Sequence, residues 1–119
     1  MKLIIAGSRE FNDYSLLEKE LNPYKHIITE IVSGNARGAD SLGERYALEY
    51  NIPIKIFKAD WNNLGRRAGI VRNHQMGNYA DLLLAFWDGK SKGTKDMIDY
   101  MKKLGKIGKV ILYNQEDLF

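Results

Sequence analysis

Apolar runs of strand length alternate with amphipathic segments along the chain. The runs are rich in Ile, Leu, Val and Phe, and most are continuous, which is typical of strands that are covered on both faces. Five strands are predicted on this basis, at residues 3–6, 27–32, 54–57, 82–86 and 109–113. The segments between them predict four helices, at residues 14–21, 39–50, 66–79 and 95–104.

This alternation predicts a single Rossmann-like domain of the α/β class that spans residues 1–119. A five-stranded parallel sheet would form the middle of three layers, with helices on both of its faces. We favour the strand order 3-2-1-4-5, while the flavodoxin-like order 2-1-3-4-5 stays open. Polar residues near three helix starts are expected to act as caps: Asn12 or Asp13, Asp40 or Ser41, and Thr94.

Composition narrows the class of protein. The 119 residues suffice for a core without disulfides or metals, and the lack of cysteine excludes a thiolate zinc site. Arg9 and Glu10 follow the first apolar run at once, so we expect a buried strand there and not a signal peptide. No segment has the length of a membrane span, and we expect a cytoplasmic protein.

Charge and residue spacing bear on the expected partners. The net charge of +3 is mild, and a nucleic-acid-binding face would be more densely basic, so we do not expect nucleic acid to bind. The carboxylates lack the spacing of a metal cluster, and no Ser-His-Asp or Cys-His arrangement is present. We therefore expect a small anionic ligand, with neither a metal nor a cofactor.

Polar, glycine-bearing loops follow four of the five predicted strands. Because the carboxyl ends of parallel strands meet at one edge of a sheet, these loops should lie together where open α/β sheets bind ligands. Their convergence predicts a shared crevice more firmly than any single motif does. The loops comprise residues 7–11, 33–40, 59–67 and 88–94.

The loop at 33–40 is the most informative of the four. Glycines between a strand and a helix let the backbone approach a ligand and leave the first helical N–H groups facing outward. Arg37 adds a planar fork that suits phosphate or carboxylate. Gly34, Arg37 and Gly38 are therefore predicted ligand contacts, while Asp40 either caps the helix or meets the ligand.

The loops at 7–11 and 88–94 each allow two interpretations. Gly7, Ser8 and Arg9 are predicted ligand contacts, although a tight turn between a strand and a helix accounts for them equally well. Gly93 and Thr94 at a helix start would form a phosphate cradle from N–H groups and a hydroxyl. The alternative there is a flexible, lysine-rich surface loop.

The helix at 66–79 and the loop before it supply the remaining candidates. This helix has few large apolar residues, and its polar residues Arg72 and Asn73 are predicted to contact the ligand. Trp61 would stack on a base or form part of a half-buried rim. Asp60 is a carboxylate expected at the same crevice.

Six short motifs follow one another over nearly the whole chain: Gly7-Ser8-Arg9-x-Phe11, Gly34-x-Ala36-Arg37-Gly38-Ala39-Asp40, Ala59-Asp60-Trp61, Gly65-Arg66-x-Ala68-Gly69-x-x-Arg72-Asn73-x-x-Met76, Ala80-Asp81 with Ala85-Phe86, and Gly89-x-x-x-Gly93-Thr94. Together they resemble the YspA-like, cpYpsA-related branch of the SLOG superfamily, found in bacteria and their phages. The resemblance implies a Rossmann-like domain that binds a nucleotide or nucleotide-derived ligand as a sensor or sequestering module. It also implies a homo-oligomer, a dimer or higher.

The superfamily includes the LOG-type phosphoribohydrolases, which release a base from a nucleoside monophosphate. Their signature implies a catalytic glutamate three residues after Thr94, where this chain has Met97. Asp96 is adjacent, but a shift of one residue turns a helical side chain by about 100°. The Pro-Gly-Gly of that signature is also missing. The resemblance thus favours binding; cleavage of an N-glycosidic bond in a nucleotide is the alternative function, so enzymatic activity stays open.

Overall fold

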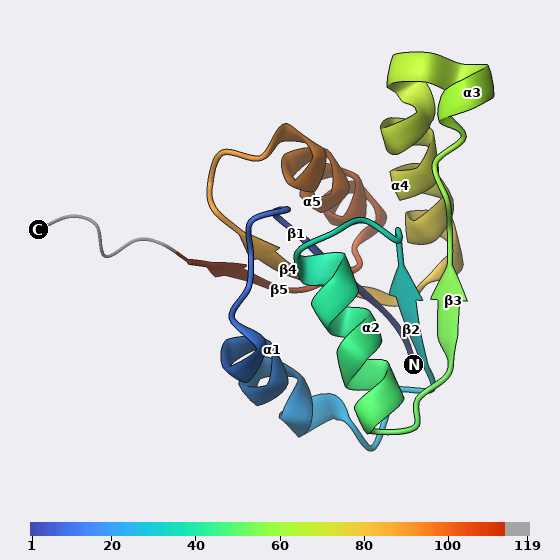
Figure 1. The fold of residues 1–119 in the computed structure, drawn as a ribbon. Helices are drawn as coiled ribbons and strands as arrows, with labels where there is room; N and C mark the ends of the chain where they lie inside the picture. Colours follow the sequence, from blue (N-terminus) through green and yellow to red (C-terminus); the bar gives the residue numbers. More distant parts are fainter. Residues whose placement is uncertain (114–119) are drawn as a thin grey trace, which may run out of the picture.

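The strands form one parallel sheet in the order β3-β2-β1-β4-β5 (Figure 1). The computed structural model describes residues 1–113, and within them the predicted strand order 3-2-1-4-5 is confirmed. Strand β1 lies at the centre and pairs with β2 on one side and with β4 on the other. The strands are β1 (Lys2–Gly7), β2 (Glu30–Ser33), β3 (Ile54–Ile56), β4 (Leu82–Trp87) and β5 (Ile107–Leu112).

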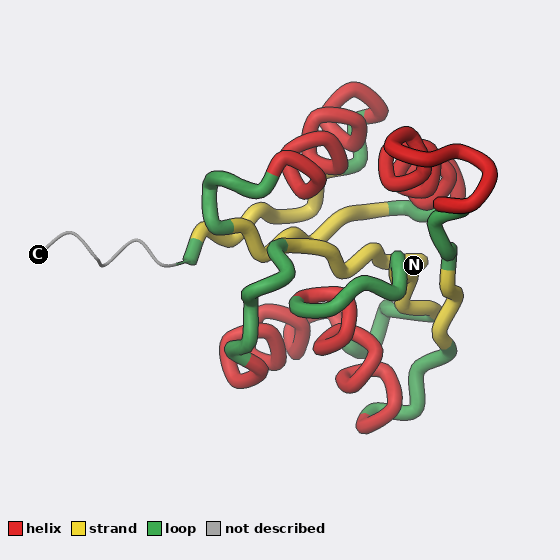
Figure 2. The backbone as a smooth tube through the Cα atoms, turned by 45° about the horizontal axis from the view of Figure 1, so that its top comes forward, coloured by secondary structure: helices red, strands yellow, loops and turns green. Residues whose placement is uncertain are grey.

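Helices cover both faces of the sheet, which confirms the predicted three-layer α/β fold (Figure 2). Helices α1 (Tyr14–Leu21) and α2 (Ala39–Glu49) lie on one face, and α4 (Ala68–Tyr79) and α5 (Lys92–Leu104) lie on the other. The short helix α3 (Trp61–Leu64) precedes α4. Within residues 1–113, no helix is both long and apolar enough to cross a bilayer.

Each face of the sheet has its own apolar core. Successive residues of a strand point to opposite faces, so Ile5 packs with Leu17 and Tyr46 on one side. Ile4 packs with Met76 and Met97 on the other side. The central strands β1 and β4 are therefore buried on both faces, as their continuous apolar sequences predict.

Several predicted element boundaries are wrong. Strand β2 begins at Glu30, because the N–H groups of Ile27 and Ile28 donate to the Tyr24 carbonyl and close a turn. A 3₁₀ turn at Gly65–Arg67 delays the start of α4 to Ala68. Strand β5 runs from residue 107 to 112, two residues earlier at its start than predicted.

The caps are partly as predicted. The Asp13 carboxylate accepts from the Leu16 N–H at 3.0 Å and caps α1, which confirms that expectation. The expectation for α5 is wrong, because Ser91 caps that helix and Thr94 lies in its first turn. The expectation for α2 is also wrong, since the capping residue is Gly38 and no side chain caps this helix.

Replacing Gly43 by alanine is expected to lower the free energy of unfolding by about 1–3 kcal/mol, the usual effect of overpacking a core. Gly43 lies on α2, and an added Cβ would stand 2.7 Å from the Cβ of Ile5 in the central strand. Urea denaturation measures the change. Gly93→Ala is the control because an added Cβ there meets nothing within 4 Å, so equal losses in both variants would contradict the packing argument.

Candidate functional site

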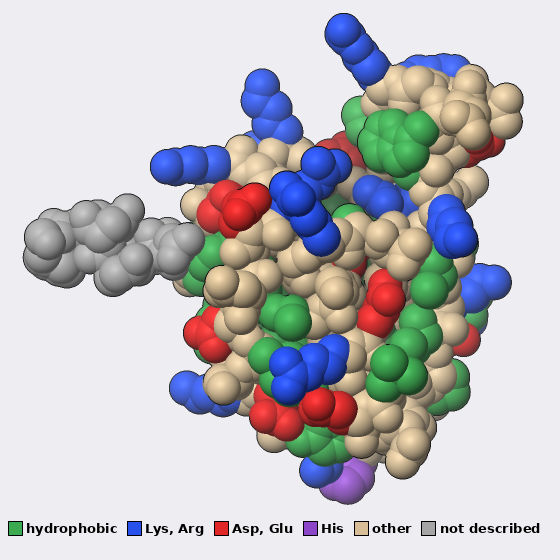
Figure 3. Space-filling model, viewed as in Figure 1, with side chains coloured by type: hydrophobic (Ala, Val, Ile, Leu, Met, Phe, Trp, Pro, Cys, Tyr) green, Lys and Arg blue, Asp and Glu red, His purple; other side chains and the backbone are tan. Residues whose placement is uncertain are grey.

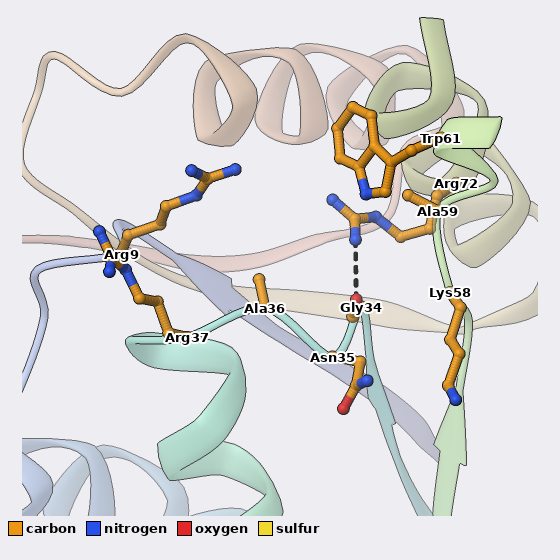
Figure 4. A pocket seen from close by; sticks show the side chains of 9 residues that line it. All are labelled: Arg9, Gly34, Asn35, Ala36, Arg37, Lys58, Ala59, Trp61 and Arg72. Atoms are coloured by element: carbon orange, nitrogen blue, oxygen red, sulfur yellow. Dashed lines mark hydrogen bonds between the residues drawn. The ribbon is translucent and has the colours of Figure 1, made fainter. Parts of the chain in front are cut away.

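Three of the four predicted loops, at 7–11, 33–40 and 59–67, contribute to a cavity of about 600 Å³ at the carboxyl edge of the sheet (Figure 4). Arg9 comes from the segment after β1, residues 34–37 from the loop between β2 and α2, and Arg72 from α4. Arg9 and Arg72 point into the cavity from opposite sides, with the indole of Trp61 above Arg72 (Figure 4). The lining residues are Arg9, Gly34, Asn35, Ala36, Arg37, Lys58, Ala59, Trp61 and Arg72.

The cavity is strongly electropositive. Four lining residues are cationic, and none of the described residues that line it carries a carboxylate. Lys and Arg side chains gather around the hollow on this face of the molecule (Figure 3). A recess lined by charge of one sign raises the local concentration of ions of the opposite sign, so this cavity favours an anion. The four cations are Arg9, Arg37, Lys58 and Arg72.

A second, smaller cavity of about 240 Å³ adjoins the first between β1, α4 and α5. Arg9, Ala36, Trp61 and Arg72 line both cavities, so one ligand could occupy them together. The smaller cavity brings in further predicted contacts, namely Gly7, Asn73, Gly93 and Thr94.

Arg72 lies at the junction of the two cavities. One guanidinium nitrogen, Nη1, donates to the Gly34 carbonyl at 2.7 Å, and Nε donates to the Asn73 side-chain oxygen at 3.2 Å. Burial lowers the pKa of Arg72, and the nearby charge of Asp40 opposes that shift. The guanidinium is thus held in place while it lines both spaces.

Asn73 fixes α4 to the start of α5. Its amide nitrogen donates to the Gly93 carbonyl and to a carboxylate oxygen of Asp96, each at 3.2 Å. The residue is 7% exposed, and its oxygen accepts from Arg72. Asn73 therefore positions Arg72 relative to the first turn of α5, in addition to lining the smaller cavity.

Asp40 is buried beneath the loop at 34–37, with 5% of its surface exposed. Its Oδ2 accepts from the N–H of Gly34 at 3.1 Å and from the N–H of Ala36 at 3.3 Å. Burial raises the pKa of Asp40 to about 6, although these N–H groups and the charge of Arg72 favour ionisation. Asp40 thus organises the preceding loop and does not cap its own helix.

At three positions around the site, the neighbouring atoms leave no room for a side chain larger than that of glycine. An added Cβ on Gly7 would lie 2.1 Å from the Phe86 carbonyl, and one on Gly38 would lie 2.3 Å from the Ser8 carbonyl. At Gly34 it would lie 2.9 Å from Asp40 Oδ2 and 3.0 Å from the guanidinium carbon of Arg72. These glycines let the loops pack tightly against each other around the site.

Three predicted contacts, Ser8, Gly38 and Asp60, line neither cavity. Ser8 is 2% exposed, and its hydroxyl accepts from the Asp88 N–H at 3.1 Å, which ties the loop after β1 to the loop after β4. Asp60 caps α3 by accepting from the Asn63 N–H at 3.3 Å. Ser8 and Asp60 both shape the loops that carry lining residues.

Arg37 and Gly38 lie at the outer rim of the site. The Arg37 side chain is 74% exposed and forms a 3.6 Å ion pair with Glu10 across the loops after β2 and β1. Gly38 turns the chain into α2 with a φ of +81°. Arg37 lines the larger cavity, whereas Gly38 lines neither.

Lys58 and Arg66 each line a cavity, although neither is among the contacts predicted from the sequence. Lys58 follows β3, so its place just beyond a strand's carboxyl end was the available signal. Arg66 lies in the 3₁₀ turn before α4, within the predicted loop at 59–67.

Met97 lines the smaller cavity and is 1% exposed, within the core between the sheet and α5. The neighbouring Asp96 turns toward α4, where it accepts from Asn73 and lies 3.7 Å from His74. Asp40 is the one carboxylate among the described residues that line either cavity. No group of three potential metal ligands occurs in residues 1–113.

Comparison with known proteins identifies the family. Residues 1–64 match the YspA, cpYpsA-related SLOG family, YAcAr. The Gene 61 protein of Mycobacterium phage D29 is 34% identical over 116 residues, covering 87% of this chain and 90% of the phage protein. The chain therefore belongs to the YspA, cpYpsA-related SLOG family. No solved structure gives a significant match.

Proposed function

We propose that this chain binds a nucleotide or nucleotide-derived ligand at the carboxyl edge of its sheet, as a sensor or sequestering module. The observation that carries the proposal is the 600 Å³ cavity lined by four cations and, within the described residues, by no carboxylate. Such a site favours phosphate groups, and membership of the SLOG family supports a nucleotide-related ligand.

The two ends of a nucleotide would meet different surfaces. Arg9 and Arg72 would neutralise phosphate, since both line the two cavities and the Arg72 fork is held in place. Trp61 is 54% exposed at the cavity wall, which leaves an indole face available to a base. Gly93 and Thr94 would contact the ligand from the first turn of α5, where the helix dipole favours an anion.

Cleavage of an N-glycosidic bond is the weaker candidate. It requires a carboxylate that stabilises an oxocarbenium-like centre or activates water, and Met97 lies where LOG-type enzymes have that glutamate. Asp40 lines the smaller cavity, but its Oδ2 is already engaged by two backbone N–H groups. Chromatography after incubation with nucleoside monophosphates and NAD distinguishes the two functions, because free base appears only with cleavage.

The proposal predicts that Arg9→Ala weakens nucleotide binding at least tenfold. Arg9 is exposed and lines both cavities, so its loss removes ligand contacts with little effect on the core. Isothermal titration calorimetry against nucleoside mono-, di- and triphosphates, cyclic dinucleotides and ADP-ribose measures the affinity of the wild type and the variant.

Arg67→Ala is the matched control for this experiment. Arg67 is also an exposed arginine, but it lies outside the lining of both cavities. Its replacement changes the net charge equally and should leave affinity within about twofold of the wild type. Equal losses in both variants, or no binding of any of these nucleotides to the wild type, would overturn the proposal.

The expected homo-oligomer and the cytoplasmic location stay predictions. A binding module of this kind acts through a change in its partners, its assembly or the free ligand concentration. Sequestration requires only tight binding, which lowers the free ligand concentration. A sensor must in addition change its assembly or its contact with a partner when the ligand binds.

A further inference from the structure

Asp40 is a buried carboxylate whose Oδ2 accepts hydrogen bonds from two backbone N–H groups. Asp40 is 5% exposed, and Arg72 is the cation that favours its ionisation. Glu44, one turn further along α2, opposes ionisation and accepts a hydrogen bond from the Ser33 hydroxyl at 2.6 Å. Burying a carboxylate in this way destabilises the fold unless its contacts compensate.

The contacts of Asp40 converge on one peptide segment of the site. Its Oδ2 holds the N–H groups of Gly34 and Ala36, while Arg72 Nη1 holds the carbonyl of Gly34. Both backbone polar groups of Gly34 are therefore held: its N–H donates to the Asp40 carboxylate, and its carbonyl accepts from the Arg72 guanidinium. Hydrogen bonds to charged groups are about twice as strong as neutral ones, so an ionised Asp40 holds the loop most firmly.

We propose that ionised Asp40 is a positioning residue, which fixes the loop at 34–37 and the Arg72 guanidinium in the arrangement that receives the anionic ligand. This inference rests on the proposed nucleotide-binding function. The carboxylate repels the ligand little, because two amide dipoles and the Arg72 charge already offset its own charge.

The effect of Asp40 on stability has a definite sign. Burial raises its pKa from 3.8 to about 6, so the unfolded chain ionises first as pH increases. Between those values the folded state is progressively disfavoured, and above pH 6 the folding equilibrium constant is reduced roughly 100-fold by this group. Asp40→Asn removes that pH dependence, so its stability relative to the wild type should increase from pH 4 to pH 8.

The test measures both the stability and the nucleotide affinity of two variants, Asp40→Asn and Gly43→Ala. The urea midpoint of Asp40→Asn should rise relative to that of the wild type between pH 4 and pH 8, and yet at pH 8 the variant should bind the nucleotides of the calorimetric panel at least fivefold more weakly. Gly43→Ala is the control, since it loses stability without touching the site, and its affinity should stay unchanged. A merely structural role for Asp40 would make stability and affinity change together.

A second measurement does not depend on the ligand or on any variant's folding. The amide proton resonances of Gly34 and Ala36 in the wild type should shift upfield as pH falls through about 6, because protonation weakens their acceptor. Amide resonances that do not titrate would overturn the proposal, as would tighter nucleotide binding by Asp40→Asn. If these resonances titrate but no nucleotide binds the wild type, the positioning of the loop stands and the proposed function fails.

Discussion

Replacing Arg72 by alanine is expected to weaken nucleotide binding at least 100-fold. Arg72 lines both cavities, as Arg9 does, and its guanidinium is in addition held by a hydrogen bond to the Gly34 carbonyl, so the variant loses a pre-positioned cation. It also leaves Asp40 buried without its facing cation, which loosens the loop above it. Truncating a hydrogen-bonded, desolvated charge in a binding site typically costs about 2–5 kcal/mol of affinity, and calorimetric titration measures the loss.

Arg72→Lys distinguishes the contribution of the positive charge to affinity from that of the planar guanidinium group. Lysine keeps the positive charge but cannot donate from two directions in one plane, so its affinity should lie between those of the wild type and Arg72→Ala. The free energy of unfolding of both variants is measured in parallel, so that binding is compared among folded proteins. Wild-type affinity in Arg72→Ala would show that the ligand binds elsewhere.

Gly38→Ala is expected to lower the free energy of unfolding by about 3 kcal/mol or more, through backbone strain and steric overlap together. Gly38 has a φ of +81°, and an added Cβ would lie 2.3 Å from the Ser8 carbonyl and 2.6 Å from the Arg9 carbonyl. Relief requires the loop after β1 to move, and this loop carries Arg9 into the cavities. Nucleotide affinity should therefore fall together with stability, as urea denaturation and calorimetry would show.

Gly89→Ala is the matched control for Gly38→Ala. Gly89 has nearly the same φ, +82°, but an added Cβ there meets nothing within 4 Å. Gly89 shares the positive φ without the overlap, so its loss should be only about 1–2 kcal/mol. Similar losses in the two variants would contradict a tight contact between the loops after β1 and β2.

The fold was largely predictable because continuous apolar strands and intervening helices impose a parallel sheet. The element boundaries were less predictable where long-range contacts decide them. The apolar Ile27 begins the predicted second strand, yet it is 56% exposed, because its N–H closes a turn onto Tyr24. The start of α5 depends on Ser91, whose hydroxyl lies 3.1 Å from that of Thr94, and both residues are plausible caps by type.

The site was predictable at the level of loops and less so at the level of side chains. Strand order brings Arg9, Gly34 and Arg72 to one edge, as expected from the glycine and arginine motifs. Sequence does not show that the Ser8 hydroxyl is used internally on Asp88, or that Asp40 reaches back to the loop before its helix. Such roles depend on how neighbouring loops pack, which no local pattern encodes.

The most direct test of the central claim is a nucleotide titration followed through the backbone amide resonances of the ¹⁵N-labelled protein. The account predicts shifts concentrated at the four loops of the carboxyl edge, together with the indole resonance of Trp61, with little change at the opposite ends of the strands. No shift with any of the panel's nucleotides, or shifts confined to the opposite edge, would contradict it.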